Sequence, residues 1–253
     1  MTESNSQTVQ AVETAFDIVT VLQARDGAGV TEIATELGLS KSSVHKHLAT
    51  LVEQRCVVKE NQEYRLGLEF FQYGGYVRNQ YEVFHKAKPR VRELAEETGE
   101  MVWLIVEENG MAMYLFGDGG SLDINVDALV GTWTHLHLNS GGKAILSEYP
   151  EERVRDIFRD SRIPKRTPHT ITEIDELLAE LEWTRERGYA LNLEEDLKGI
   201  HAIGAPIVHR NEVKGALSIA GAANRLTEER CHDEYADLLL TAVNDLELNL
   251  TYK

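Results

Sequence analysis

The sequence predicts an α+β protein with an N-terminal winged helix-turn-helix, a linker helix and a larger C-terminal domain whose helices flank an antiparallel sheet. Two helical patterns joined by a tight turn at residues 30–55, with two short strands after them, predict the first domain. Strand-like segments between amphipathic helices predict the second. With 253 residues, the chain is long enough for two cores. We expect the domain boundaries at 9–67, 68–82 and 83–253.

An amphipathic helix over residues 9–25 begins the first domain, after residues 1–8, which we expect to be disordered. Its apolar stripe consists of Val12, Ala15, Phe16, Val19 and Leu22. Ile18 and Val21 extend this stripe around the helix. Because the helix is apolar on more than one side, we expect it to contact both its own core and a second subunit.

The helix-turn-helix follows at residues 30–55. Gly38 supplies the left-handed residue that ends the first helix, and Ser40 stands where the second helix needs an N-cap. The second helix turns four apolar residues at helical spacing toward the core, namely Val44, Leu48, Leu51 and Val52.

The opposite face of the second helix is small and polar, with one central cation. A helix that enters a DNA major groove needs small residues for close approach, hydroxyl groups, and Lys or His to reach acceptors. The residues expected to contact DNA from this helix are Lys41, Ser42, Ser43, His45, Lys46 and Thr50. The alternative is the ordinary solvated face of a helical hairpin, and the spacing alone does not separate the two.

A predicted hairpin after these helices favours DNA binding. Residues 56–58 and 64–66 read as short strands joined by a polar turn at residues 60–62. Such a wing, here carrying Lys59 and Arg65, contacts the DNA backbone beside the groove that the second helix enters.

The net charge argues against binding nucleic acid by bulk attraction, since it is −16 at a sequence pI of about 5.0. Residues 1–67 hold six Lys or Arg against nine Asp or Glu, a net charge of −3, so −13 belongs to the remainder. An acidic surface also suits a cytoplasm of very high salt, where screening weakens the repulsion from DNA. A salt-loving source is therefore a hypothesis, with unfolding or low solubility in dilute buffer as its expected consequence.

No apolar run approaches membrane-spanning length, and the polar N-terminus lacks the pattern of a secretion signal, so we expect a soluble, cytoplasmic protein. Cys56 and Cys231 fall in different predicted domains without metal-ligand spacing. We expect both to be reduced, structural thiols.

The predicted linker, residues 67–80, is rich in large apolar side chains and is weakened as a helix by Gly74 and Gly75. These side chains are Leu68, Phe70, Phe71, Tyr73 and Tyr76. We expect them to pack against a partner chain or the neighbouring domain; the alternative is a buried helix of one continuous domain. We expect a dimer, because DNA-binding domains of this kind usually bind the two half-sites of a DNA target through two-fold symmetry.

The second domain is predicted from alternating and helical apolar patterns, with Gly99 and Gly188 ending two helices and residues 108–110 turning a hairpin. In chain order we expect a helix at 83–98, strands at 101–107 and 111–118, an alternating strand-like stretch at 133–138, helices at 141–146, 151–159 and 171–188, strands at 189–193, 200–208 and 213–220, and a final helix at 235–250.

Two rival site types are weaker. Five histidines raise the question of zinc, namely His135, His137, His169, His201 and His209. Only the first two lie close in sequence, so solvated or hydrogen-bonded histidines explain them better. Residues 194–196, an acidic run, are interpreted as a charged turn, since no nucleophile, base and orienting group stand together. We expect no metal, no cofactor and no enzymatic activity.

Five strings carry a resemblance: Lys41-Ser42-Ser43-Val44-His45-Lys46, Asn139-Ser140-Gly141-Gly142-Lys143-Ala144, Gly188-Tyr189-Ala190, residues 199–207 and residues 215–221. In order and spacing the chain resembles the IclR family of transcriptional regulators along nearly its whole length. The resemblance implies a winged helix-turn-helix, a linker helix and a GAF-like effector-binding domain. It also implies a homodimer or a dimer of dimers.

By position, the resemblance implies that Ser140 and Gly141 lie at the pocket-facing start of a helix, whose free N–H groups suit a carboxylate. The rest of the pocket is implied to be lined by Asn192, Ile200, Ala202, Ser218 and Ala220. Relatives that bind small keto acids carry an acidic residue, a cysteine and a serine where this chain has Asn192, Ala202 and Ala220. We therefore expect a less acidic pocket of different shape.

The resemblance implies a transcriptional regulator that binds double-stranded operator DNA and is modulated by a small organic effector, such as a carboxylate or a sugar-derived acid. Its targets would be catabolic genes. In the reader helix, Lys46 stands where the family often has arginine, and His47 replaces an expected apolar residue. The alternative function is a ligand-binding or dimerisation module without specific DNA binding.

Overall fold

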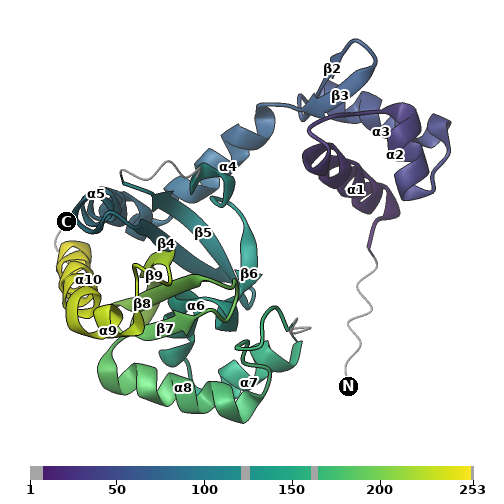
Figure 1. Ribbon diagram of the computed structural model, residues 1–253. Helices are drawn as coiled ribbons and strands as arrows, with labels where there is room; N and C mark the ends of the chain where they lie inside the picture. Colours follow the sequence, from purple (N-terminus) through teal and green to yellow (C-terminus); the bar gives the residue numbers. More distant parts are fainter. Residues whose placement is uncertain (1–7, 121–125, 161–164, 252–253) are drawn as a thin grey trace. The chain divides into compact units, whose positions relative to one another are not determined.

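The computed structural model describes residues 8–120, 126–160 and 165–251 (Figure 1). The chain divides into two compact units, residues 1–80 and residues 81–253. Helices and antiparallel strands occur in both units, so the predicted α+β class is confirmed. Within the described ranges, no helix is long and apolar enough to cross a membrane.

The N-terminal unit packs three helices against a small antiparallel sheet of strand order β1-β3-β2. These elements are α1 (Gln10–Ala24), β1 (Ala28–Gly29), α2 (Val30–Leu37), α3 (Lys41–Glu53), β2 (Val57–Glu60) and β3 (Glu63–Leu66). Its core contains Ile18, Leu22, Ile33, Val44 and Leu48, all fully buried. The winged helix-turn-helix is therefore present as predicted.

The turn between α2 and α3 has the predicted chemistry. Gly38 ends α2 in the left-handed region, with φ 65°. The Ser40 side chain accepts the backbone N–H of Ser43 at 3.1 Å and so caps α3. Local capping thus fixes where the second helix begins.

The apolar residues of α1 divide between a buried side and an exposed side of the helix. Val12 and Phe16 are 53% and 61% exposed, whereas Ile18, Val21 and Leu22 form the buried face. The helix is apolar around more than half of its circumference, so periodicity alone does not select the face that packs. Val52 of α3, also predicted to face inward, is 38% exposed.

The wing is tighter than predicted. Glu60 pairs with Glu63, so only Asn61 and Gln62 form the turn, and Asn61 adopts a left-handed conformation with φ 57°. The two-residue strand β1 was not predicted, because residues that break a helix carry no strand pattern. It pairs with β3 and closes the small sheet.

Helix α4 (Glu69–Asn79) lies where we expected a linker helix and runs through Gly74 and Gly75. None of its side chains is buried within the described chain. Leu68, just before it, and Phe71 and Tyr76 within it are the most exposed of its large apolar side chains.

The C-terminal unit is built on a six-stranded antiparallel sheet of order β6-β5-β4-β9-β8-β7. The strands are β4 (Met101–Glu108), β5 (Met111–Asp118), β6 (Trp133–His135), β7 (Ala190–Leu193), β8 (Ile200–His209) and β9 (Glu212–Ala222). The predicted hairpin between β4 and β5 is confirmed, with Asn109 and Gly110 both at positive φ.

Helices cover both faces of this sheet (Figure 1). Helices α5 (Glu82–Thr98) and α10 (Ala236–Thr251) cover one face over a core that includes Leu104, Ile203 and Leu217. The other face carries α6 (Ser140–Ser147), with α7 (Glu151–Asp160) and α8 (Ile174–Arg187) around it. We call this second face, which displays Trp103, Ala202, Ser218 and Ala220, the α6 face.

Two predicted boundaries differ. The stretch 133–138 was expected to alternate as one strand, but β6 ends at His135 and a 3₁₀ turn spans Leu136–Leu138. Leu136, His137 and Leu138 are all buried, whereas a strand covered on one face buries only alternate residues. Helix α8 begins at Ile174 rather than Ile171. A three-residue helix, α9 (Glu228–Arg230), and a π turn at Cys231–Tyr235 precede α10.

Candidate functional site

The residues predicted to contact DNA from α3 lie mostly on its open side. Lys41, Ser42, His45, Lys46 and Thr50 are exposed, and Ser43 is half-buried. The inward side is held by Val44 and Leu48 of the core. The outward side therefore consists of short polar side chains around two lysines. The Thr50 hydroxyl donates to the Lys46 carbonyl at 3.2 Å, so it is already engaged within the helix.

The two wing cations do not share a face of the hairpin. Lys59 lies opposite Tyr64 and its Nζ lies 5.4 Å from the centre of that ring. Arg65 pairs with Val58, the residue before Lys59. Its guanidinium is 3.9 Å from the Glu63 carboxylate. Because side chains alternate across a strand, one of these cations points away from whatever the other contacts.

The predicted effector residues come together on the α6 face. Asn192, Ala202 and Ala220 are neighbours across β7, β8 and β9. Ser218 lies on the same face, two residues before Ala220. Ile200 is the first residue of β8 and is half-buried. Ala202 and Ala220 are only 8% and 9% exposed and belong to the apolar cluster beneath α6. We call Ile200, Ala202 and Ala220 the apolar floor.

The start of α6 lies directly on this floor. A Cβ on Gly204 would stand 2.6 Å from the Gly141 nitrogen, so only glycine allows the approach. The Ser140 and Ser218 hydroxyls bond each other at 2.9 Å, 78 residues apart in sequence. One of the two hydroxyl protons is used in the hydrogen bond between the serines. The other hydroxyl proton can be donated to a ligand.

Asn139 was not predicted as a site residue, although it belongs to a quoted motif. Its Oδ1 caps α6 by accepting the Gly142 N–H at 2.6 Å. Its buried Nδ2 has no partner among the described residues. The first N–H groups of a helix also lack acceptors within it. Unpaired donors therefore gather at the positive end of α6, an arrangement that suits an anion.

Asn192 makes two hydrogen bonds within the protein that the resemblance does not imply. Its Nδ2 donates to the Leu138 carbonyl at 2.6 Å, and its Oδ1 accepts the Glu195 N–H at 3.1 Å. The amide thus ties the turn before α6 to the turn after β7.

The acidic run 194–196 forms a charged turn after β7, as expected, but two of its side chains are paired and at least partly buried. Lys143 is 1% exposed and pairs with Glu195 at 2.7 Å and with Glu180 at 3.5 Å. Burial raises the pKa of the Glu195 carboxyl, against the opposing effect of Lys143. Asp196 is half-buried and pairs with Arg166 at 2.9 Å. Sequence patterning misses these pairs because it assigns charged residues to the surface.

Aromatic side chains border the same face. Trp103 pairs across the sheet with Ser218 on one side and Gly117 on the other, and its ring occupies the space where a Gly117 side chain would be. Tyr114 meets Trp103 edge to face, with ring centroids 5.1 Å apart. Burial raises the pKa of Tyr114 to about 12, so its phenol stays protonated at neutral pH.

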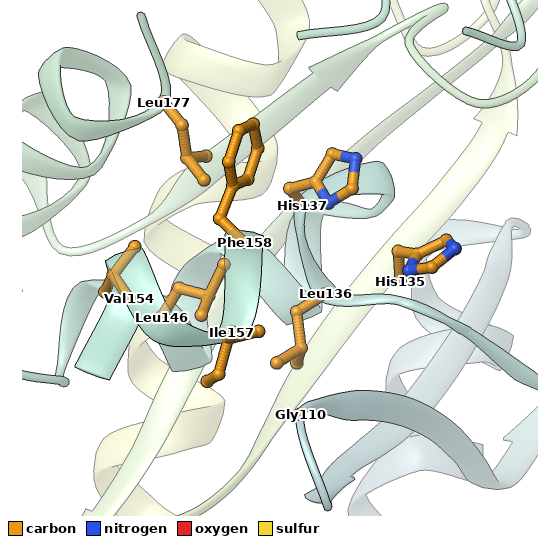
Figure 2. Close-up of a pocket in the computed structure, with 9 residues that line it drawn as sticks. All are labelled: Gly110, His135, Leu136, His137, Leu146, Val154, Ile157, Phe158 and Leu177. Carbon is orange, nitrogen blue, oxygen red and sulfur yellow. The ribbon is translucent and has the colours of Figure 1, made fainter. Parts of the chain in front are cut away.

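A small cavity lies under α7 (Figure 2). Its lining is Gly110, His135, Leu136, His137, Leu146, Val154, Ile157, Phe158 and Leu177. His137 is 3% exposed, its Nε2 has no partner among the described residues, and burial lowers its pKa to about 4. Burial also lowers the pKa of His135. Both rings are therefore neutral at neutral pH.

In the part of the chain that the structure describes, no three His, Cys, Asp or Glu side chains gather closely enough to hold a metal ion. His169, His201 and His209 are separate from the pair under α7, and His201 bonds the Leu226 carbonyl at 2.9 Å. Cys56 and Cys231 are free thiols.

Comparison with known proteins gives consistent matches. Residues 76–248 match the family model for the bacterial transcriptional regulator IclR C-terminal domain, and residues 11–61 match the IclR helix-turn-helix domain. A probable HTH-type transcriptional regulator ArcR from Halobacterium salinarum is 29% identical over 247 residues, covering 96% of this chain and 94% of that protein.

Solved structures agree. The crystal structure of the Thermotoga maritima IclR matches with a TM-score of 0.80 at 29% identity, covering 96% of this chain and 99% of that one. An IclR homologue from Microbacterium hydrocarbonoxydans, complexed with 4-hydroxybenzoate, matches with a TM-score of 0.81 at 17% identity, covering 96% of this chain and 100% of that one, and shows the shared fold alone. Members of this family are transcriptional regulators rather than enzymes. With both of its domains matched, the chain belongs to the IclR family and is a DNA-binding transcriptional regulator with a C-terminal ligand-binding domain.

Proposed function

We propose that α3 enters the major groove of a promoter site and that the wing contacts the flanking phosphates. The observation that carries this proposal is the outward side of α3, where short polar side chains surround Lys41 and Lys46. Short side chains let the helix backbone approach base edges, and the lysines neutralise phosphates or reach acceptors. The groove-facing residues are Lys41, Ser42, Ser43, His45, Lys46 and Thr50. On the wing, Lys59 and Arg65 lie on opposite faces of the hairpin, so one of the two contacts the flanking phosphates.

Charge reversal tests this assignment. The double substitution Lys41→Glu and Lys46→Glu should abolish the retention of genomic DNA fragments at every salt concentration and leave thermal unfolding unchanged, because both side chains are exposed. Lys165→Glu combined with Lys198→Glu, at two exposed positions of the C-terminal unit, makes the same change in net charge and should retain DNA. Unchanged retention by the variant with Lys41→Glu and Lys46→Glu would contradict the groove assignment. If the folded wild-type protein retains no fragment, the second candidate holds, a ligand-binding or dimerisation module.

For the C-terminal unit we propose a small carboxylate effector at the start of α6. The supporting groups are the Ser140–Ser218 hydroxyl pair, the first N–H groups of α6 including that of Gly141, and the Asn139 Nδ2, which has no partner among the described residues. Ile200, Ala202 and Ala220 form the floor beneath the ligand, with Asn192 at its edge. An apolar floor favours the degradation products of organic or aromatic acids over sugar-derived acids as the regulated chemistry.

Removing one hydroxyl tests the carboxylate site. Benzoate is a suitable probe, titrated calorimetrically against wild type, Ser140→Ala and the control Ser147→Ala. A hydrogen bond to a charged group contributes roughly 1.5–3 kcal/mol. Ser140→Ala should therefore weaken binding by about ten-fold or more, whereas Ser147, which bonds the Ala144 carbonyl of its own helix, should not matter. Equal affinities would contradict the site.

We further propose that the protein is a homodimer. Effector binding would move α4 and so change the spacing between the two winged helix-turn-helix domains. A ligand shifts such an equilibrium only by its differential affinity for the two arrangements. The exposed apolar side chains of α1 and α4, such as Phe16 and Phe71, support a covering second chain.

A further inference from the structure

The two faces of the wing hairpin, which consists of β2 and β3, have different surroundings. Val57 and Tyr64 are buried and belong to the core of the N-terminal unit, together with Val44 and Leu48 of α3. Val58 points to the opposite face of the hairpin and is 42% exposed. We call the face of Val57 and Tyr64 the inner face, because it lies on the side of α3, and the face of Val58 the outer face.

Lys59 lies on the inner face, two residues after Val57 on the same strand. It pairs with Tyr64, and its Nζ lies 5.4 Å from the centre of that ring. Lys59 and the following residues 60–63 are exposed, so the core ends at this point. Within the described ranges, no ion pair involves Lys59. Its ammonium group is therefore on the side of α3 and available to a phosphate.

Arg65 lies on the outer face and is already engaged. An added Cβ on Gly27 would stand 3.0 Å from Arg65 Cγ and 3.2 Å from its Nε, so this side chain lies along the turn between α1 and β1. Its guanidinium also faces the Glu63 carboxylate at 3.9 Å. The strands themselves stand between the outer face and α3. A duplex that α3 enters is therefore beyond the reach of Arg65.

The tip of the wing carries negative charge. Glu60 and Glu63 pair directly across the hairpin, on either side of Asn61 and Gln62, and all four residues are exposed. No Lys or Arg stands among them. A narrow minor groove has an enhanced negative potential that attracts inserted cations. Two carboxylates at the tip are unfavourable there, because like charges repel at close range.

We propose that Lys59 is the single phosphate contact of the wing and that Glu60 and Glu63 keep its tip out of the minor groove. The wing then fixes the position of α3 on the duplex without reading base sequence, since phosphate contacts carry no sequence information directly. Arg65 holds the wing to the turn between α1 and β1. This proposal rests on the proposed entry of α3 into the major groove.

Substitutions to methionine separate the two cations, because methionine keeps an aliphatic side chain and removes the charge. Binding to a fluorescent genomic fragment retained by the wild-type protein is measured by anisotropy over a series of KCl concentrations. Lys59→Met should make the slope of log K against log[KCl] shallower by about 0.9 for each bound chain, and should weaken binding by roughly four-fold near 0.2 M KCl. The loss should be equal on a duplex of unrelated sequence. Arg65→Met should keep the wild-type slope.

Two further variants control for charge and for folding. Lys198→Met removes one positive charge from an exposed position of the C-terminal unit and should keep the wild-type slope. Lys59→Arg retains the charge on the wing and should also keep the slope. A wild-type unfolding temperature for Lys59→Met would exclude misfolding as the cause of its weaker binding.

The tip is tested by Glu60→Gln combined with Glu63→Gln. Removal of the two charges weakens the repulsion from phosphates, so binding should tighten by about two-fold or more on the retained fragment and on the unrelated duplex alike. Weaker binding by this variant would mean that the carboxylates themselves contact DNA, and would overturn the exclusion of the tip.

The outcomes distinguish this proposal from the groove assignment. If Arg65→Met makes the slope shallower, alone or together with Lys59→Met, Lys59 is not the single contact. If neither variant changes the slope while Lys41→Glu with Lys46→Glu abolishes retention, the wing contacts no phosphate and the groove assignment survives. If the folded wild-type protein retains no fragment, both proposals fail.

Discussion

The burial of Lys143 could not be predicted from the sequence, because lysine is almost always exposed unless it is paired. Its ammonium group is enclosed with Glu195, and removal of one partner of a buried pair leaves the other charge uncompensated. We expect Lys143→Met to lower the free energy of unfolding by roughly 3–5 kcal/mol. Chemical denaturation measures this loss. Lys143→Met combined with Glu195→Leu should regain much of it.

An exposed pair provides the control for that experiment. Arg159 and Asp156 form an ion pair on the surface of α7, and surface pairs contribute roughly 0–1 kcal/mol. Arg159→Met should therefore have little effect. If Lys143→Met is equally harmless, Glu195 has found water or another partner, and the buried pair does not hold α6 in place.

His137 predicts how stability depends on pH. The unfolded imidazole takes a proton near pH 6.5, whereas burial holds the folded pKa at about 4. A group whose pKa is lowered by folding contributes stability above the unfolded pKa and loses it as pH falls through the folded pKa. The free energy of unfolding should fall by about 3 kcal/mol between pH 6.5 and pH 4.

Two variants isolate this effect in denaturation curves measured at several pH values. His137→Gln removes the titrating group and should flatten the dependence in that range. His169→Gln, at an exposed position, should keep the wild-type dependence. An equal pH dependence in His137→Gln and wild type would show that other groups, such as His135, carry it.

At the scale of elements, the contact of α6 with β8 depends on one missing side chain. Gly204→Ala would place a Cβ 2.6 Å from backbone atoms of Ser140 and Gly141, which cannot rotate away. Overpacking of this kind costs roughly 1–3 kcal/mol. We expect a melting temperature lower by about 3–10 °C, using roughly 2–4 °C per kcal/mol for a chain of this size.

Gly74→Ala in α4 is the opposite case. Nothing lies within 4 Å of the Cβ that it would add, and alanine is favoured over glycine inside a helix by up to about 1 kcal/mol. This variant should melt no lower than wild type. A drop comparable to that of Gly204→Ala would mean that another surface lies against Gly74.

The elements were predictable from sequence where the signal is local. Gly38 and Ser40 mark the turn of the helix-turn-helix, and Asn109 with Gly110 mark a hairpin, because capping and turn geometry restrict residue type directly. The buried face of α1 was not predictable, since its apolar residues surround most of the helix.

The candidate site was predictable only through resemblance. The Ser140–Ser218 bond joins residues 78 positions apart, and no local pattern sets that register. Arg166 and Asp196 belong to separate segments and pair at 2.9 Å only when the connections are assembled. A charged turn looks ordinary in isolation.

At the scale of the whole molecule, the net charge of −16 predicts salt dependence. Self-repulsion destabilises a compact acidic chain, and the screening length falls from about 10 Å at 0.1 M salt to about 3 Å at 1 M. We expect the melting temperature to rise steadily with KCl up to molar concentrations. A sucrose series of equal osmolality is the control, because it changes water activity without screening. A melting temperature independent of KCl would contradict adaptation to a high-salt interior.

The exposed aromatic residues of α4 also make this helix a built-in reporter of assembly. Phe71, Tyr73 and Tyr76 are cleavage sites for chymotrypsin, and a short helix with two adjacent glycines opens easily to a protease. If a second chain covers α4, digestion should slow as protein concentration rises through the dimerisation range. Cleavage would also release the two units as separate fragments. One digestion series would thus report the dimerisation constant. It would also yield the N-terminal DNA-binding unit separated from the C-terminal unit.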